Sequence, residues 1–171
     1  DPGNGSLAVV DTVALSGIPT GVAAADLDGD GTAESIVTTT TGYLDIVRGE
    51  TDFSRSSIPL PPGKIATAIT TGRFDAVPGP EIVVAVIDEG EGESQLLVIR
   101  PRPTEGPGGG TLLDLVNVIP LNDAPTALAL GTGGTSKSER GTLSIGVLSP
   151  VVENPDVKLL MAAFRSSSLH A

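Results

Sequence analysis

The amino-acid sequence predicts an all-β protein made of β-propeller blades, each a sheet of four antiparallel strands. Short runs rich in Val, Ile, Thr and Leu recur along the 171 residues, and turn-forming Gly and Pro separate them. No window longer than a strand keeps the roughly 3.6-residue hydrophobic spacing of an amphipathic helix. One segment also recurs at a fixed offset, which is typical of repeat architectures.

Each hydrophobic run has the length of a single strand. In chain order the expected strands are 7–15, 21–27, 35–40, 43–49, 65–72, 81–88, 95–100, 112–121, 126–133, 142–149 and 157–164. Turn sequences such as PPG (61–63), VPGP (77–80) and EGPGGG (105–110) lie between them.

The repeat defines the expected boundaries of the blades. Residues 18–28 align with 65–75 without a gap, at an offset of 47 (Ile18 to Ile65), and a weaker third copy begins at 124–134. Units of roughly 45–60 residues with four strands have the size of a propeller blade. The matched pairs include Thr20 with Thr67, Val22 with Ile69, Asp28 with Asp75, Glu34 with Glu81, and Val37 with Val84.

These copies divide the chain into an outer strand of a preceding blade (1–17), two blades (18–61 and 62–121) and an incomplete blade (122–171). About three blades cannot close a ring, because a propeller needs at least about four. We therefore expect a segment of a larger propeller, completed by the remaining blades. The alternative is a homo-oligomer that forms through the open blade edges, since unpaired edges bind other strands.

Composition excludes several classes of function. A net charge of −11 disfavours nucleic acid and anionic membranes as partners, and no hydrophobic run approaches the ~20 residues that span a bilayer. The chain has no Cys, and its one His is the penultimate residue, His170. Mechanisms that need a thiolate therefore have no candidate residue, those that need an imidazole have only this one near the end of the sequence, and we expect no enzyme activity from this chain.

The stretch ADLDGDGTAES (25–35) places oxygen donors at every second residue. Calcium takes about six to eight oxygen ligands from carboxylates and backbone carbonyls of a tight loop. Gly29 and Gly31 allow the positive φ that such a loop requires. A plain acidic turn is the alternative, but without a cation its carboxylates would repel one another. We therefore expect one Ca²⁺ site, formed by Asp26, Asp28, Asp30, the backbone carbonyl of Thr32, and Glu34.

This loop is not an EF-hand, because its twelfth position is Val37, within an expected strand. The pattern resembles the FG-GAP/VCBS repeat family, whose best-known members are the integrin α-subunit heads. The resemblance implies a β-propeller, calcium on the loop, and recognition of proteins outside cells or at the cell surface. It also implies that Leu27 packs between blades, and that Glu34 replaces the usual Asp as the last ligand.

The second copy of the loop, GRFDAVPGPE (72–81), has lost the alternating carboxylates. Arg73 is expected to replace the cation and pair with Asp75 or Glu81, while Phe74 packs where Leu27 does. The third copy has no acidic residues at these positions. A separate acidic cluster, Asp88, Glu89, Glu91 and Glu93, is expected to be a solvated hairpin loop, with a weak second cation site as the alternative.

The sequence thus favours a non-catalytic, calcium-stabilised module for protein binding or assembly in a secreted, cell-surface or periplasmic protein. The alternative is part of a propeller enzyme, a hydrolase or lyase, whose catalytic residues lie on other blades. Fold alone does not separate the two, because propellers host many chemistries.

Overall fold

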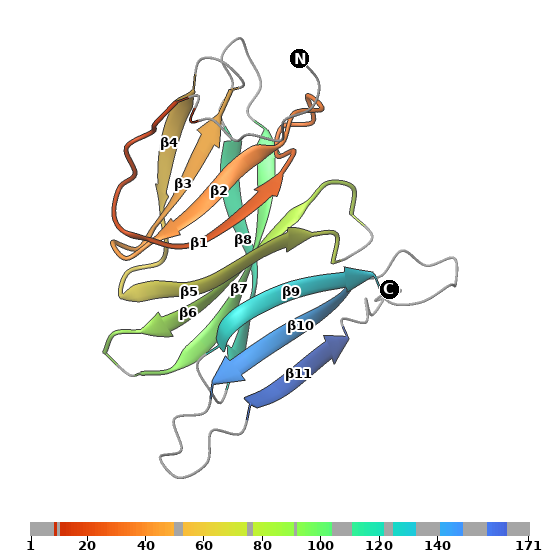
Figure 1. The fold of residues 1–171 in the computed structure, drawn as a ribbon. Coiled ribbons are helices and arrows are strands. Elements are labelled where there is room, and N and C mark those ends of the chain that lie inside the picture. The colour runs from red at the N-terminus through yellow and green to blue at the C-terminus, as the bar shows by residue number, and fades with distance from the viewer. Residues whose placement is uncertain are drawn as a thin grey trace.

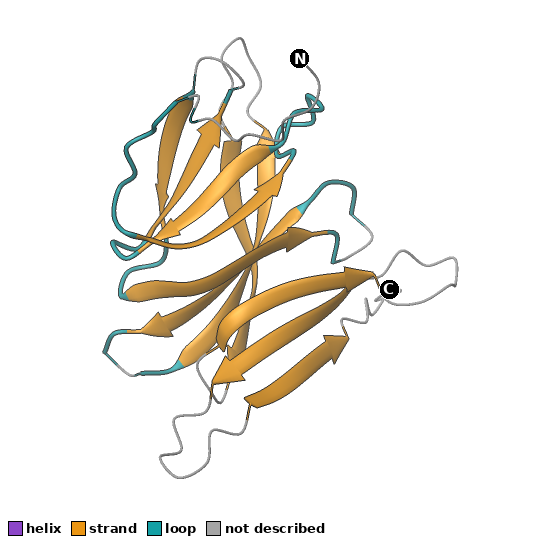
Figure 2. Cartoon of the chain, in the orientation of Figure 1, coloured by secondary structure: helices purple, strands orange, loops and turns teal. Residues whose placement is uncertain are grey.

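The computed structural model describes residues 9, 11–49, 53–74, 77–90, 92–103, 111–121, 125–132, 141–148 and 157–163. These residues form eleven β-strands and no helix (Figures 1 and 2). The all-β prediction is confirmed. In the described part of the chain, no helix is present that could cross a membrane.

The strands form three antiparallel sheets, each ordered as in the sequence. The first sheet contains β1 (Pro19–Ala25), β2 (Glu34–Thr39), β3 (Tyr43–Arg48) and β4 (Ser54–Pro59). The second contains β5 (Lys64–Gly72), β6 (Glu81–Asp88), β7 (Ser94–Pro103) and β8 (Thr111–Leu121). The third contains β9 (Pro125–Thr132), β10 (Gly141–Leu148) and β11 (Val157–Ala163).

The first strands of the three sheets, β1, β5 and β9, lie side by side (Figure 1). Threonine hydroxyls of β5 connect them: Thr71 Oγ1 donates to the carbonyl of Ala24 at 2.9 Å, and Thr67 Oγ1 donates to the carbonyl of Pro125 at 2.7 Å. The three sheets therefore meet along their first strands.

Each first strand contains a β-bulge at the same repeat position. The register shifts at Thr20 in β1, at Thr67 in β5 and at Thr126 in β9. A bulge adds one residue to one strand and bends it locally. The sequence repeat therefore reproduces an irregular backbone feature as well as the hydrophobic pattern.

Two hydrophobic clusters fill the spaces between the sheets. The first joins the first and second sheets and contains Leu27, Ile36, Leu44, Ile46, Leu60, Ala66, Ile69, Ile82, Val84, Val86, Leu97 and Ile99. The second contains Ala68, Phe74, Val83, Ala85, Leu96 and Val98, with Leu128 of β9 packed against it. The second sheet is thus covered on both faces, which explains why β6 is buried from Glu81 to Val86.

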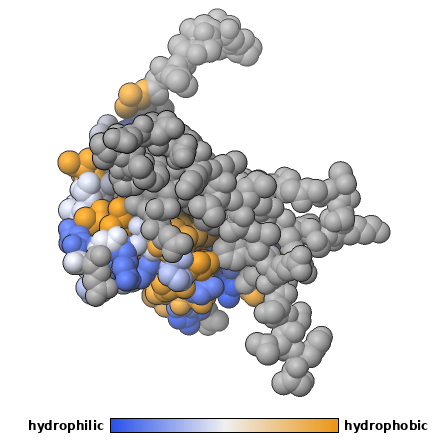
Figure 3. All heavy atoms as spheres, turned by 90° about the horizontal axis from the view of Figure 1, so that it is seen from below, coloured by the Kyte–Doolittle hydropathy of each residue, from blue (hydrophilic) through white to orange (hydrophobic). Residues whose placement is uncertain are grey.

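On the face shown in Figure 3, the exposed hydrophobic residues among those described do not form one continuous patch. Seen from below, the described atoms show several separate hydrophobic patches among hydrophilic ones (Figure 3). Four hydrophobic side chains of the outer strand β8 are more than two-fifths exposed: Leu112, Leu115, Val116 and Val118.

Two strand predictions were wrong. No strand forms in the described part of the expected 7–15 run, namely residue 9 and residues 11–15. Strand β4 was missed because its sequence, SRSSIP, is polar. It is an outer strand whose first four residues are exposed, so the hydrophobic alternation that marks a half-buried strand is absent.

The segment before β1 is held by a buried carboxylate. Asp45 of β3 is fully buried and accepts hydrogen bonds from the backbone N–H of Ser16 at 2.6 Å and from the Ser57 hydroxyl at 2.5 Å. Arg55 lies 3.7 Å from the same carboxylate. Burial raises the pKa of Asp45, but these hydrogen bonds and Arg55 outweigh burial, and the net pKa lies below its ordinary value.

Candidate metal centre

The loop between β1 and β2 wraps its backbone around its own carboxylates. Asp26 Oδ1 accepts from the N–H of Gly29 at 2.7 Å, and its Oδ2 accepts from the N–H of Gly31 at 3.0 Å. Gly29 and Gly31 have φ of 82° and 92°, as the sequence predicted. Side chains with a Cβ rarely adopt these angles, so the glycines make the tight loop accessible.

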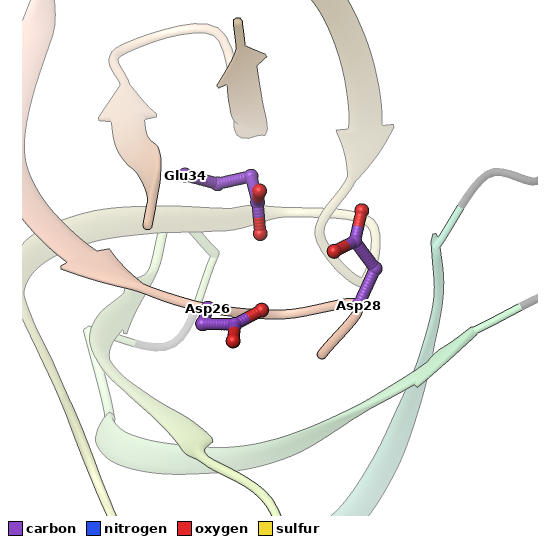
Figure 4. Close-up of side chains that lie close together, drawn as sticks. All are labelled: Asp26, Asp28 and Glu34. Atoms are coloured by element: carbon purple, nitrogen blue, oxygen red, sulfur yellow. The ribbon is translucent and has the colours of Figure 1, made fainter. Parts of the chain in front are cut away.

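Three of the predicted ligands converge. Asp26, Asp28 and Glu34 each offer a carboxylate oxygen, and these oxygens lie within 4.8 Å of one another. Figure 4 shows the three side chains pointing into a common space from the two sides of the loop. This is the one such cluster of His, Cys, Asp or Glu found among the described residues.

Glu34 is the anchored member of the cluster. It begins β2, is only 3% exposed, and accepts a 2.7 Å hydrogen bond from the N–H of Leu27 through Oε2. Burial raises the pKa of Glu34; the Leu27 N–H opposes this increase, and the negative charges of Asp28 and Asp30 add to it. The cluster therefore holds a carboxylate whose ionised form is costly unless a cation is nearby.

Asp30, another predicted ligand, is not a member of this cluster. Asp30 is exposed, and its Oδ1 accepts from the N–H of Thr32 at 2.7 Å, so its carboxylate is engaged by its own turn. Ligation by the backbone carbonyl of Thr32 stays a prediction.

Arg48 approaches the cluster from the end of β3. Its Nε lies 3.9 Å from Asp28 Oδ2, and its side chain is 20% exposed. In the β2–β3 ladder Ser35 pairs with Val47, which places Arg48 beside Glu34. Arg48 thus partly offsets the negative charge of the loop.

The second sheet repeats this arrangement with a different charge balance. Glu81 begins β6, is 3% exposed, and accepts a 2.8 Å hydrogen bond from the N–H of Phe74, just as Glu34 accepts from Leu27. Leu27 and Phe74 are both buried, each in a cluster between sheets.

The side chain that neutralises Glu81 is Arg100 of β7. Arg100 Nη2 donates to Glu81 Oε1 at 2.7 Å. The sequence predicts that Arg73 pairs with Asp75 or Glu81; Arg73 is exposed, and its pairing with Asp75 stays a prediction because Asp75 lies outside the described residues. Strand pairing could have identified Arg100. Ile82 pairs with Ile99 as Ser35 pairs with Val47, so Arg100 in the second sheet occupies the position of Arg48 in the first.

The acidic cluster after β6 forms a hairpin turn. Asp88 Oδ2 accepts from Lys64 Nζ at 2.7 Å, and its Oδ1 accepts from the N–H of Gly90 at 2.9 Å. Glu89 and Glu93 are exposed, and Glu91 lies outside the described residues.

A cavity of about 510 Å³ lies beside the β2–β3 turn and the β4–β5 connection. Tyr43, Lys64, Glu89 and the prolines Pro59, Pro61 and Pro62 contribute to its lining. The Lys64 ammonium is bound to Asp88, and Thr40 and Thr41 add hydroxyl groups, so the lining mixes polar and hydrophobic groups.

The chain matches no family model, and neither the search of curated proteins nor the search of solved structures gave a significant match.

Proposed function

We propose that this chain is part of a calcium-stabilised β-propeller of the FG-GAP/VCBS type that serves as a module for protein binding or assembly, secreted or at the cell surface. The observation that carries the proposal is the convergence of Asp26, Asp28 and the buried Glu34 on one space.

The arrangement of the sheets supports the propeller part of the proposal. Propeller blades are four-stranded sheets arranged radially around a central axis. Here two four-stranded sheets and one three-stranded sheet meet along their first strands, which share a threonine bulge. On this proposal β1, β5 and β9 line the axis, and further sheets are required to close the ring.

The donor set supports calcium over other metals. The converging atoms are all carboxylate oxygens, which hard cations prefer, whereas zinc sites in proteins use mainly Cys and His. Magnesium requires nearly ideal octahedral geometry and usually keeps several waters. A loop with carboxylates at alternate positions suits the larger calcium ion, whose coordination geometry is less strict.

The proposed role of the ion is structural. A divalent cation between Asp26, Asp28 and Glu34 offsets their repulsion and removes the cost of ionising buried Glu34. It would fasten the loop to the start of β2 and, through the Leu27 N–H, to the core between the first two sheets. A rigid loop at the end of a blade is a suitable recognition surface.

Thermal unfolding in excess calcium and in excess EGTA tests the proposal. A ligand that binds only the native state at about 100 times its Kd adds about 2.7 kcal/mol to the free energy of unfolding, which raises the Tm by roughly 5–10 °C. Asp28→Asn should lose most of this increase. The matched control is Asp114→Asn, which changes an exposed carboxylate on β8 that pairs with Arg102. Superimposed calcium and EGTA curves for the parent protein would sink the proposal.

A further inference from the structure

We infer that Arg48 competes electrostatically with calcium for the carboxylate cluster of Asp26, Asp28 and Glu34, so that it stabilises the metal-free loop and weakens the binding of the ion. The inference rests on the proposed function, because it concerns the affinity of the proposed calcium site. It starts from the position of Arg48, which ends β3 between this cluster and strand β4.

The Arg48 side chain contacts the loop and the neighbouring strand at once. Its Nε lies 3.9 Å from Asp28 Oδ2, and its Nη1 donates a 3.0 Å hydrogen bond to Ser56 Oγ on β4. The distance from Nε to Asp28 is too long for a hydrogen bond, so this contact acts through charge. One end of the guanidinium is thus held by a residue outside the cluster, while the other end faces a proposed calcium ligand.

The second sheet shows the same position with its cation fully engaged. Arg100 has the ladder position of Arg48, and it donates a 2.7 Å hydrogen bond to Glu81 Oε1. Glu81 is the buried glutamate equivalent to Glu34. In the second sheet the arginine therefore neutralises the start of the β5–β6 pair by itself. This comparison identifies the position as one from which an arginine can act as the cation of its loop.

The charge of Arg48 opposes calcium in both states of the loop. Without the ion, the guanidinium attracts Asp28 and offsets one of the three negative charges of the cluster. With the ion bound, the same positive charge repels it. Both effects reduce the free energy gained on binding. Even at the dielectric constant of water, a unit charge about 6 Å from a divalent ion changes the affinity for that ion about ten-fold.

The expected consequence is a site that fills only at high calcium concentration. The number of charged ligands tunes the Kd of a calcium loop, and sites in extracellular modules have Kd values of about 10⁻⁴–10⁻³ M. Since Arg48 offsets part of the ligand charge, we expect the loop to fall in this weak range. The loop then releases calcium where the ion is scarce, and Arg48 supports it in the metal-free state.

Isothermal titration calorimetry of the metal-free protein with CaCl₂ tests the inference. Arg48→Gln removes the charge and keeps an N–H donor for Ser56, and it should lower the Kd about ten-fold. Arg48→Lys keeps the charge and should leave the Kd close to that of the parent. The matched control is Arg102→Gln, which removes the same charge from an exposed pair with Asp114 on the second sheet and should leave the Kd unchanged.

Thermal unfolding separates this role from a structural one. In EGTA, Arg48→Gln should be less stable than the parent, and its calcium-induced rise in Tm should be larger because its Kd is lower. Arg48→Met, a second neutral variant, should behave in the same way. A loss of stability with an unchanged Kd would overturn the inference.

The same titrations distinguish this inference from the proposed function. If the parent binds calcium and neither neutral variant binds it more tightly, Arg48 does not compete with the ion, and the metal site stands. If neither the parent nor the neutral variants bind calcium, the metal site itself is wrong, and the inference fails with it.

Discussion

Arg100 Nη2 donates a 2.7 Å hydrogen bond to Oε1 of Glu81, at the position where the first sheet gathers carboxylates around Glu34. The two glutamates begin equivalent strands and accept the same type of backbone hydrogen bond. The second loop thus carries its own cation, while on our proposal the first loop takes one from solution.

Arg100→Met should destabilise the protein whether or not calcium is present. Glu81 is 3% exposed, and removing one partner of a fully buried pair costs about 3–5 kcal/mol because it leaves an uncompensated charge. Arg100 is 30% exposed and its charge is partly screened by solvent, so we expect a smaller loss of about 2 kcal/mol of unfolding free energy. Urea denaturation in calcium and in EGTA measures it. Adding Glu81→Gln should recover part of the loss; a double variant less stable than Arg100→Met contradicts this explanation.

Glu34→Gln should separate the stability of the metal-free protein from its response to calcium. The pKa of Glu34 in the folded protein is raised above its ordinary value of 4.5. The protonated side chain therefore contributes stability that is fully present below about pH 4.5 and is lost as the pH rises through the folded pKa. At neutral pH the uncharged amide should therefore match or exceed the parent in EGTA, and it should lose most of the calcium-induced rise in Tm. A Glu34→Gln protein that keeps the full calcium response would remove Glu34 from the ligand set.

Asp45→Asn should produce a pH-dependent loss of stability. The folded pKa of Asp45 is lowered, so its contribution is present above its ordinary value of 3.8 and is lost as pH falls through the folded pKa. Hydrogen bonds to a charged group contribute about 2 kcal/mol, so we expect a loss of that size at pH 7 and a smaller one in acid. Chemical denaturation from pH 7 down to about 3 measures the difference. An equal loss at every pH would show that the charge is not involved.

Thr67→Val should loosen the third sheet from the second. The substitution keeps the side-chain shape but removes the 2.7 Å hydrogen bond to the carbonyl of Pro125, at a cost of about 1 kcal/mol. Faster hydrogen exchange confined to β9 is the expected signature. Thr20→Val is the matched control, because its hydroxyl bonds Thr38 within one sheet. Equal effects on β9 would contradict the assignment.

The features predicted best from the sequence are those that depend on neighbouring residues in the chain or on the sequence repeat. The positive φ of Gly29 and Gly31 follows from a tight acidic loop, and the burial of Leu27 and Phe74 follows from the repeat. Arg100 was missed because it is distant in sequence from the loop it serves and reaches Glu81 only through the β6–β7 ladder. Strand β4 was missed because an outer strand can remain polar on both faces.

The failed prediction over 7–15 has another cause. A hydrophobic run favours a strand only where a neighbouring strand accepts its backbone hydrogen bonds. At the end of this segment, the N–H of Ser16 instead donates to the Asp45 side chain, and its carbonyl accepts a hydrogen bond from Thr41 Oγ1. Side-chain partners thus take the place of a ladder, and the local sequence does not reveal them.

The bond between Ser16 and Asp45 also has a mechanical consequence. Tension entering through residues 11–15 reaches this bond before it reaches the first residue of β1. Asp45 lies on β3, two strands away from β1, so the load passes into the interior of the sheet. Pulling from this side would therefore not unzip β1 one residue at a time until the Asp45 attachment had ruptured.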